Sequence, residues 1–230
     1  MSRTIVFYYK GTEISYEGLE KLTQQITAPL KSSYDGIIET LIDNGTSRFF
    51  IIKNFTPDYF DHFQKLSHTL EHEPPIVVFG KQCNQKRNVG FFSNESDGYN
   101  YSKQTMKSQP LKNKLMIDIM AKVNDVLNTK FNGILFNQYI DGTKTVGSHS
   151  DDEKGLDAKK SCVAGIAYGA TRLFRIRDIK TNEIVLDHYH EPCSLIVMDG
   201  DFQKEYKHEI PQQKKVKDIR ISLTFRSHTV

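Results

Sequence analysis

The triplet His149-Ser150-Asp151 is the pattern in this chain that most directly suggests chemistry. Side chains two residues apart point to the same side of an extended strand, so His149 and Asp151 could bind one ion together. Two histidines and one carboxylate leave open coordination positions, as in the non-haem Fe(II) oxygenases. By itself the triplet also fits a surface histidine beside an acidic turn. The candidates for a third ligand are the downstream histidines His188, His190, His208 and His228.

Among these histidines, His208 has the position in the sequence that best suits a third metal ligand. It follows an apolar strand and a turn, and it lies 12 residues before the segment 220–226. That position places it on the strand that leads toward this segment. We therefore expect His149, Asp151 and His208 to be the metal ligands.

Residues 220–226 read RISLTFR, with an arginine at each end. With a period of two, Arg220, Ser222, Thr224 and Arg226 share one face, and apolar residues share the other. A half-exposed strand with its polar face in water would explain this pattern. The alternative is a strand that lines a pocket, where two guanidiniums bind the two anionic ends of a small ligand. In non-haem Fe(II) oxygenases, the small dianion that binds beside the metal is 2-oxoglutarate. The metal motif and the paired arginines together therefore favour a pocket-lining strand.

The composition of the whole chain is that of an ordinary globular protein. Of its 230 residues, 38% are hydrophobic and 26% are charged, and the net charge of +3 permits anionic partners without requiring them. Cys83, Cys162 and Cys193 are widely spaced and odd in number. This suits the reducing environment inside a cell better than a disulfide-bonded secreted domain. No apolar stretch approaches the ~20 residues that span a membrane, and the N-terminal apolar run is too short for a signal peptide. We expect a soluble, intracellular protein, with nucleus and cytoplasm left open.

The first part of the chain is predicted to be mainly helical. Pro57 suits a first helical turn, and the apolar residues that follow it have helical spacing. The Asn44-Gly45 pair is a plausible end of an earlier helix. The expected strands are 4–9 and 49–52, and the expected helices are 16–26, 35–44 and 56–73.

After Pro74-Pro75 the pattern changes to short strands separated by turn residues, interrupted by one helix at 110–127. This order predicts an α+β fold with a double-stranded β-helix (jelly-roll) core packed against N-terminal helices. No strong linker is present, so we expect one domain at 47–230 after an N-terminal extension at 1–46. The expected strands are 76–79, 135–140, 162–168, 171–177, 183–186, 194–198 and 220–225.

Several segments resemble the AlkB-type Fe(II)/2-oxoglutarate dioxygenases, which oxidatively demethylate alkylated nucleobases. The resemblance covers about residues 47–227 and begins with FIIKNFTPDYF. It is most specific in FNQYIDGTKTVGSHSDDE, GATRLFRIR, SLIVMDGDFQKEYKHEIP and RISLTFR. A generic dioxygenase would share only the metal ligands. Residues 1–46 have no counterpart that we can place.

The resemblance implies roles for the motif residues, beginning with iron binding by the three ligands named above. Asn137 and Tyr139 correspond to the pair that hydrogen-bonds 2-oxoglutarate. Arg220 corresponds to the partner of its distal carboxylate, and Arg226 to the arginine near the iron-bound end. The implied 2-oxoglutarate residues are Asn137, Tyr139, Arg220, Ser222, Thr224 and Arg226.

The resemblance also implies the reaction. Fe(II) is the cofactor, with 2-oxoglutarate and O2 as co-substrates that yield succinate and CO2 while an N-methyl group is hydroxylated. The hydroxylated base, of the 1-methyladenine or 3-methylcytosine type, then releases formaldehyde. The expected partner is alkylated DNA, with RNA left open. We expect a monomer that does not bind a membrane.

A base must leave the duplex to reach such a pocket, so the resemblance implies residues for base flipping. Phe91 and Phe92 are candidates to stack on the base, although the family's tryptophan is absent here and core packing is an equal alternative. Asp152 resembles the residue that senses the base edge, and a solvated acidic turn is its alternative. Phe79 resembles a wedge inserted into duplex DNA, or else belongs to a core strand. The implied substrate residues are Phe79, Arg87, Phe91, Phe92, Tyr99, Tyr101, Asp152 and Glu153.

Two other classes of protein are compatible with the metal motif. A dioxygenase of the same fold could act on a protein side chain or a lipid. A non-catalytic binding module could have kept the fold, but every metal and co-substrate position holds a competent residue. The aromatic segment 88–102 and the acidic residues after the metal motif favour a nucleic-acid substrate over a protein or lipid substrate.

Overall fold

The computed structural model describes residues 7–9, 12–14, 36–78, 80–101, 104–152, 155–156 and 162–229. The first two segments form a short antiparallel hairpin of β1 (Phe7–Tyr9) and β2 (Thr12–Ile14). Strand β1 falls within the strand predicted at 4–9. The helix predicted at 16–26 lies outside the described residues.

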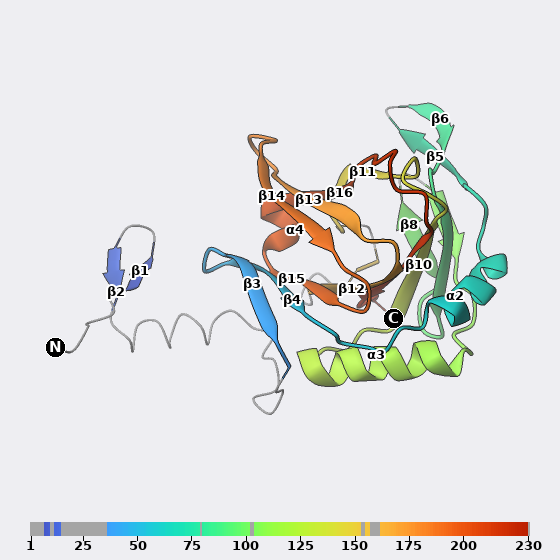
Figure 1. The fold of residues 1–230 in the computed structure, drawn as a ribbon, viewed down its shortest axis with the longest axis horizontal. Helices are drawn as coiled ribbons and strands as arrows, with labels where there is room; N and C mark the ends of the chain where they lie inside the picture. The colour runs from blue at the N-terminus through green and yellow to red at the C-terminus, as the bar shows by residue number, and fades with distance from the viewer. Residues whose placement is uncertain are drawn as a thin grey trace.

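Two antiparallel sheets form the body of the molecule (Figure 1). The large sheet has seven strands in the order β3-β4-β15-β12-β17-β10-β7. The small sheet has four strands in the order β11-β16-β13-β14. The large-sheet strands are β3 (Ile38–Asp43), β4 (Ser47–Ile52), β7 (Asn88–Ser93), β10 (Gly133–Tyr139), β12 (Val163–Gly169), β15 (Leu195–Gly200) and β17 (Arg220–Arg226). The small-sheet strands are β11 (Val146–His149), β13 (Arg172–Asp178), β14 (Ile184–His190) and β16 (Tyr206–Ile210).

The two sheets face each other across a shared apolar cluster. Phe49, Ile196 and Met198 contribute to it from the large sheet, and Phe174 and Ile176 contribute from the small one. Side chains that alternate along each strand reach this interior from both sides. Any polar group on the same inner faces is therefore held between the sheets.

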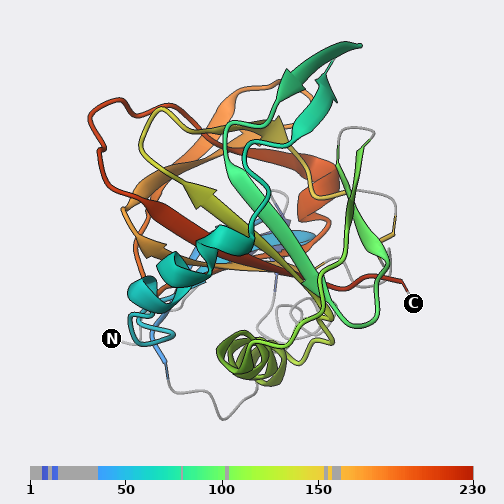
Figure 2. The same cartoon turned by 90° about the vertical axis from the view of Figure 1, so that its right-hand side faces the viewer.

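Helix α3 (Lys114–Leu127) covers the outer face of the large sheet, and Figure 2 shows it end-on beneath the strands. Its buried face, which includes Ile119 and Val123, packs in one cluster with the apolar side chains of β17. The Asn113 side chain caps the helix by accepting a hydrogen bond from the backbone N of Met116. The large sheet thus has an apolar outer face and a mixed inner face.

Smaller elements surround the sheets. Two antiparallel hairpins, β5 (Pro75–Val78) with β6 (Lys81–Asn84) and β8 (Gly98–Tyr101) with β9 (Gln104–Lys107), lie beyond them, and β5–β6 projects from the body (Figure 1). The remaining helices are α2 (Phe60–Leu66), the 3-10 turn η1 (Ser67–Thr69) and α4 (Phe202–Glu205). None of the helices in the described part of the chain is long and apolar enough to span a bilayer.

Residues 36–44, the described part of the helix predicted at 35–44, are not helical. Strand β3 pairs antiparallel with β4 across a turn in which Gly45 has a φ of 87°. The isoleucines and threonine of β3 favour a strand, and an Asn-Gly pair between two apolar runs signals a hairpin as readily as a helix end. Helix α3, from the middle of the chain, covers the large sheet, and Phe63 of α2 packs in the same cluster. The expected packing of the core against N-terminal helices is therefore met in part, by α2.

The other predicted strands after residue 46 are confirmed, with ends shifted by a few residues. The helix predicted at 56–73 is shorter and consists of α2 followed by η1. The strands β6, β7, β8, β9 and β11 were not predicted, because their sequences are polar or glycine-rich and lack alternation. The domain boundary after residue 46 stays a prediction.

The burial of α3 gives a matched test of the outer core. Ile119 is 4% exposed and Ile117, on the same helix, is 37% exposed. Ile119→Ala should lower the free energy of unfolding by about 2–5 kcal/mol, because it leaves a cavity in the packed face. Ile117→Ala should cost well under half of that. Urea unfolding of both variants measures the difference, and equal losses would contradict this packing.

Candidate active site

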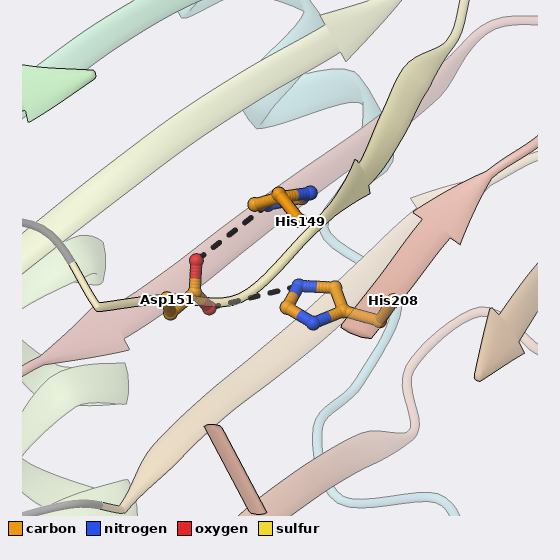
Figure 3. A group of neighbouring side chains, drawn as sticks. All are labelled: His149, Asp151 and His208. Carbon is orange, nitrogen blue, oxygen red and sulfur yellow. Dashed lines mark ion pairs between the residues drawn. The ribbon is translucent and has the colours of Figure 1, made fainter. Parts of the chain in front are cut away.

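The three predicted metal ligands come together at one end of the small sheet (Figure 3). His149 ends β11 and pairs in register with His208 on β16. Asp151 follows two residues later and lies between them, with its Oδ1 3.6 Å from His149 Nε2 and its Oδ2 3.7 Å from His208 Nε2. The potential ligand atoms all lie within 4.8 Å of one another.

Both histidines are neutral, as metal ligation requires. His149 Nδ1 lies 2.8 Å from the carbonyl oxygen of Gly147, which can only accept, so Nδ1 carries the proton and Nε2 keeps its lone pair. Burial holds the pKa of His149 below its ordinary value. Burial and the neighbouring His149 lower the pKa of His208 to about 3. The ring of Phe174 stacks on His208 at 5.2 Å and limits its rotation.

Asp151 is buried as a carboxylate. Burial alone would raise its pKa, but the charge and the hydrogen bond of the Arg226 guanidinium outweigh burial and hold the pKa well below the usual range. Arg226 Nη2 donates to Asp151 Oδ1 at 2.6 Å. The backbone N of Asp151 donates to Gln203 Oε1 at 2.9 Å, which ties the ligand to α4. Two neutral imidazoles and one ionised, anchored carboxylate fit Fe(II).

One cavity between the sheets is lined by all of the residues predicted for the metal and for 2-oxoglutarate. The pairing of β10 with β17 brings them together, because Asn137 lies opposite Ser222 and Tyr139 lies opposite Arg220. These side chains alternate with core residues along both strands and so share the inner face. The sheet register therefore builds the wall of the cavity.

The polar groups of this wall are incompletely paired. Asn137 Oδ1 and Arg220 Nε are buried and have no hydrogen-bond partner. Burial lowers the pKa of Arg220 to about 10, so the guanidinium remains charged at neutral pH. Within the described residues no ion pair reaches Arg220. Its near neighbours are the Tyr139 ring, 5.4 Å away, and His190. This end of the cavity is suited to a carboxylate ligand.

Arg226 has a different environment from Arg220. Its charge is paired with Asp151, and its guanidinium lies 5.2 Å from the centre of the Tyr99 ring. The two arginines of β17 therefore do not form an equivalent pair of anion sites. Arg220 is the cation at the far end of the cavity, and Arg226 supports the Asp151 carboxylate.

Some of the residues predicted to contact a base line the cavity, and others pack in the core. Arg87 and Tyr99 line the cavity. Phe91 is 0% exposed and packs against Tyr99 and His228, whereas Phe92 packs toward the outer core near Phe136. Neither phenylalanine lines the cavity, which agrees with the core-packing alternative.

The other four base-contact predictions lie at the margin of the described chain. Asp152 is exposed and directly follows Asp151, one of the predicted metal ligands. The backbone of Tyr101 ends strand β8, but its side chain is outside the description. Phe79 and Glu153 lie outside the described residues.

Two site residues were missed by sequence reasoning. Gln203 holds the backbone of Asp151, and His190 lines the cavity beside Arg220. Gln203 lies inside a segment that resembles the family, but a residue that acts through a backbone N–H carries no spacing signal. His190 had been considered only as a metal ligand. Extending the period-two pattern of β14 to its end would have placed it on an inner face.

Known proteins match this chain over most of its length. Residues 52–226 match the 2OG-Fe(II) oxygenase superfamily. The alpha-ketoglutarate-dependent dioxygenase alkB homolog 3 of Bos taurus is 29% identical over 141 residues, 56% of this chain and 48% of that protein. The DNA oxidative demethylase ALKBH2 of Bos taurus is 32% identical over 164 residues, 66% of this chain and 56% of that protein.

Other similarities extend further along the chain. The DNA oxidative demethylase ALKBH2 of Arabidopsis thaliana is 27% identical over 244 residues and covers 89% of this chain and 74% of its own length. The solved structure of OsALKBH1 has a TM-score of 0.57 at 16% identity, with 84% of this chain and all of that chain covered, and supports the mostly antiparallel fold. The chain spans about half the length of the alkB homolog 3 relatives. The family match covers most of the chain and includes every residue predicted to bind the metal or the co-substrate. The chain therefore belongs to the 2OG-Fe(II) oxygenase superfamily and is an AlkB-type member of it.

Proposed function

We propose that this protein is an Fe(II)/2-oxoglutarate-dependent dioxygenase that removes N-methyl groups from DNA bases of the 1-methyladenine and 3-methylcytosine type. The observation that carries the proposal is a single cavity that holds the His149–Asp151–His208 cluster and a buried, charged Arg220. The two facing sheets fit the double-stranded β-helix of such enzymes, with the cavity between them. The relatives named as DNA oxidative demethylases support the choice of substrate.

His149, Asp151 and His208 hold the iron in this proposal. Bound Fe(II), with 2-oxoglutarate and O2, supplies oxidation of the N-methyl group with release of succinate and CO2, after which the hydroxylated base loses formaldehyde. Arg226 keeps Asp151 ionised, and Gln203 fixes the backbone from which this ligand projects. Phe174 keeps the His208 ring in place.

Arg220 binds the distal carboxylate of 2-oxoglutarate. The Nε of its guanidinium is free for this contact, and Asn137 Oδ1 is a second buried polar atom open to a ligand or its water. Ser222 and Thr224 supply hydroxyls along the same wall. These contacts orient the co-substrate with its keto acid end toward the metal ligands and keep bulk water out of the cavity.

Arg87 and Tyr99 are the described residues that we assign to the alkylated nucleotide, since both line the cavity beside the metal ligands. Asp152 and Glu153 are proposed to face the base edge, and Tyr101 the nearby backbone. Phe79, which follows β5 in the sequence, is proposed as the duplex wedge. RNA remains a second substrate to test, and we propose that the enzyme acts as a monomer.

A same-fold dioxygenase acting on a protein side chain or a lipid is the competing function. The metal and co-substrate residues would be identical, so only the substrate can separate the two. The relatives named as DNA oxidative demethylases favour a nucleic-acid substrate over a protein or a lipid.

The proposed function is tested by supplying the protein with Fe(II), 2-oxoglutarate, ascorbate and oligonucleotides that carry single methylated bases. Mass spectrometry should show loss of the methyl group from 1-methyladenine or 3-methylcytosine. Asp151→Ala should abolish the reaction because the only carboxylate among the proposed ligands is removed. Succinate formation without demethylation of any oligonucleotide would support the protein or lipid alternative, and no succinate at all would contradict the enzyme itself.

Arg220→Ala should raise the apparent Michaelis constant for 2-oxoglutarate by at least about 30-fold, because a buried charge partner of the co-substrate is lost. Affinity for the oligonucleotide should change little. Arg175→Ala is the matched control, since Arg175 pairs with Asp187 away from the cavity. A loss of oligonucleotide affinity with an unchanged constant for 2-oxoglutarate would contradict the assignment of Arg220.

Gln203→Leu should weaken metal binding, because the backbone N–H of Asp151 loses its buried acceptor. We expect the Mn(II) dissociation constant, measured by electron paramagnetic resonance, to rise roughly tenfold. Lys204→Leu is the control, since that side chain is exposed and pairs only with Asp201 in the described chain. Equal Mn(II) affinity of both variants and the wild type would show that Gln203 has no such role.

A further inference from the structure

His190 is a buried histidine that belongs to the cavity but has no place in the mechanism above. It ends strand β14 at the edge of the small sheet and is 1% exposed. Its Nδ1 lies 3.2 Å from Arg220 Nη2, and its Nε2 lies 3.1 Å from the carbonyl oxygen of Ser194. It is not one of the metal-binding cluster. Both of its ring nitrogens therefore have a defined partner.

These two partners fix the protonation of His190. A guanidinium can only donate, so Nδ1 must accept from Arg220; a carbonyl can only accept, so Nε2 must donate to Ser194. The ring is consequently neutral and in the tautomer with the proton on Nε2. Burial and the nearby Arg220 lower its pKa to about 3, in agreement with this geometry.

The contact limits the orientation of Arg220. With Nη2 directed at His190, the plane of the guanidinium cannot turn freely, and its unpartnered Nε remains available in the cavity. The Tyr139 ring lies 5.4 Å from the guanidinium carbon and restricts it further. Two neighbours thus hold one cation in a single orientation.

The groups around His190 do not offer it another function. Arg172 lies opposite it in the β13–β14 pairing, but this guanidinium donates to Gln213 and to the carbonyls of Asp141, Lys144 and Pro211. His188, two residues earlier on the same face, meets the edge of the Phe49 ring and does not line the cavity. Among these groups, only Arg220 is hydrogen-bonded to His190 and also lines the cavity.

We propose that His190 is a positioning residue that aims Arg220 at the distal carboxylate of the co-substrate and so sets the affinity of the enzyme for 2-oxoglutarate. This inference rests on the proposed function, since it requires that 2-oxoglutarate binds at Arg220. The affinity then depends on the neutral acceptor His190 behind the arginine as well as on the arginine itself. An apolar residue at position 190 would fill the space but leave Arg220 free to rotate and one of its donors without a partner.

The test compares three variants of the full-length, Mn(II)-loaded protein by calorimetric titration with 2-oxoglutarate. His190→Phe keeps a buried ring without an acceptor and should raise the dissociation constant for 2-oxoglutarate roughly 10- to 100-fold, the effect of one hydrogen bond to a charged group. His190→Asn places its Oδ1 near the position of Nδ1 and should stay within about threefold of the wild type. His188→Phe is the matched control on the same strand and face and should bind 2-oxoglutarate as the wild type does.

Mn(II) affinity and melting temperature, measured on the same samples, separate positioning from general damage. Mn(II) affinity should be unchanged in all three variants. If His190→Phe does not fold, His190→Leu, which is smaller and also lacks an acceptor, takes its place with the same expected loss. The inference is overturned if the Phe or Leu variant binds 2-oxoglutarate normally, or if His190→Asn loses as much affinity as they do. If the wild type itself binds no 2-oxoglutarate, the proposed function fails together with the inference.

Discussion

Strand β17 has to satisfy two opposite environments at once, and the rest of the structure is arranged around this constraint. Its apolar residues, such as Leu223, are completely buried against α3, while Arg220 and Arg226 on the other face line the cavity. Because side chains alternate, a shift of one residue in register would place both guanidiniums in the apolar core, where an unpaired charge is very costly. The pairings with β10 on one side and β12 on the other prevent that shift. The forces that build the sheet therefore also build the site.

Three of the buried guanidiniums around the cavity, those of Arg172, Arg220 and Arg226, are compensated in different ways. Arg226 pairs with Asp151, and the pair keeps a metal ligand ionised. Arg172 donates only to neutral oxygens of nearby loops, so its role is to tie those loops together. Arg220 has a neutral histidine and an aromatic ring beside it and no carboxylate among the described residues. A buried ion is stable only when it is paired or well hydrogen-bonded. Of the three, Arg220 is the one whose environment calls for an anionic ligand.

The sequence was sufficient for the parts of the site that follow from local periodicity. His149 and Asp151 share a spacing of two, and the polar face of β17 is visible in RISLTFR, so both could be predicted without knowing which strands are neighbours. The contacts of His190 and Gln203 could not, because each depends on a partner more than 25 residues away that only the sheet topology identifies. The helix prediction for residues 35–44 was wrong for another reason. The Asn44-Gly45 pair is compatible with a helix end and with a hairpin, and tertiary pairing with β4 decided between them.

Incomplete hydrogen bonding is concentrated where a ligand would bind. Asn137 Oδ1, Asp151 Oδ2 and Arg220 Nε are all buried without a hydrogen-bond partner, and their residues line one cavity. A buried polar group that neither water nor a ligand pairs costs about 1–3 kcal/mol, so these atoms are where a bound ligand can replace water as the hydrogen-bond partner. A metal ion and a dicarboxylate that satisfy these atoms bind only the folded state, and at 100 times its dissociation constant a ligand adds about 2.7 kcal/mol of stability. The cavity is thus the least satisfied part of the core and the part that gains most from binding, which is the physical relation expected between a stable scaffold and its functional site.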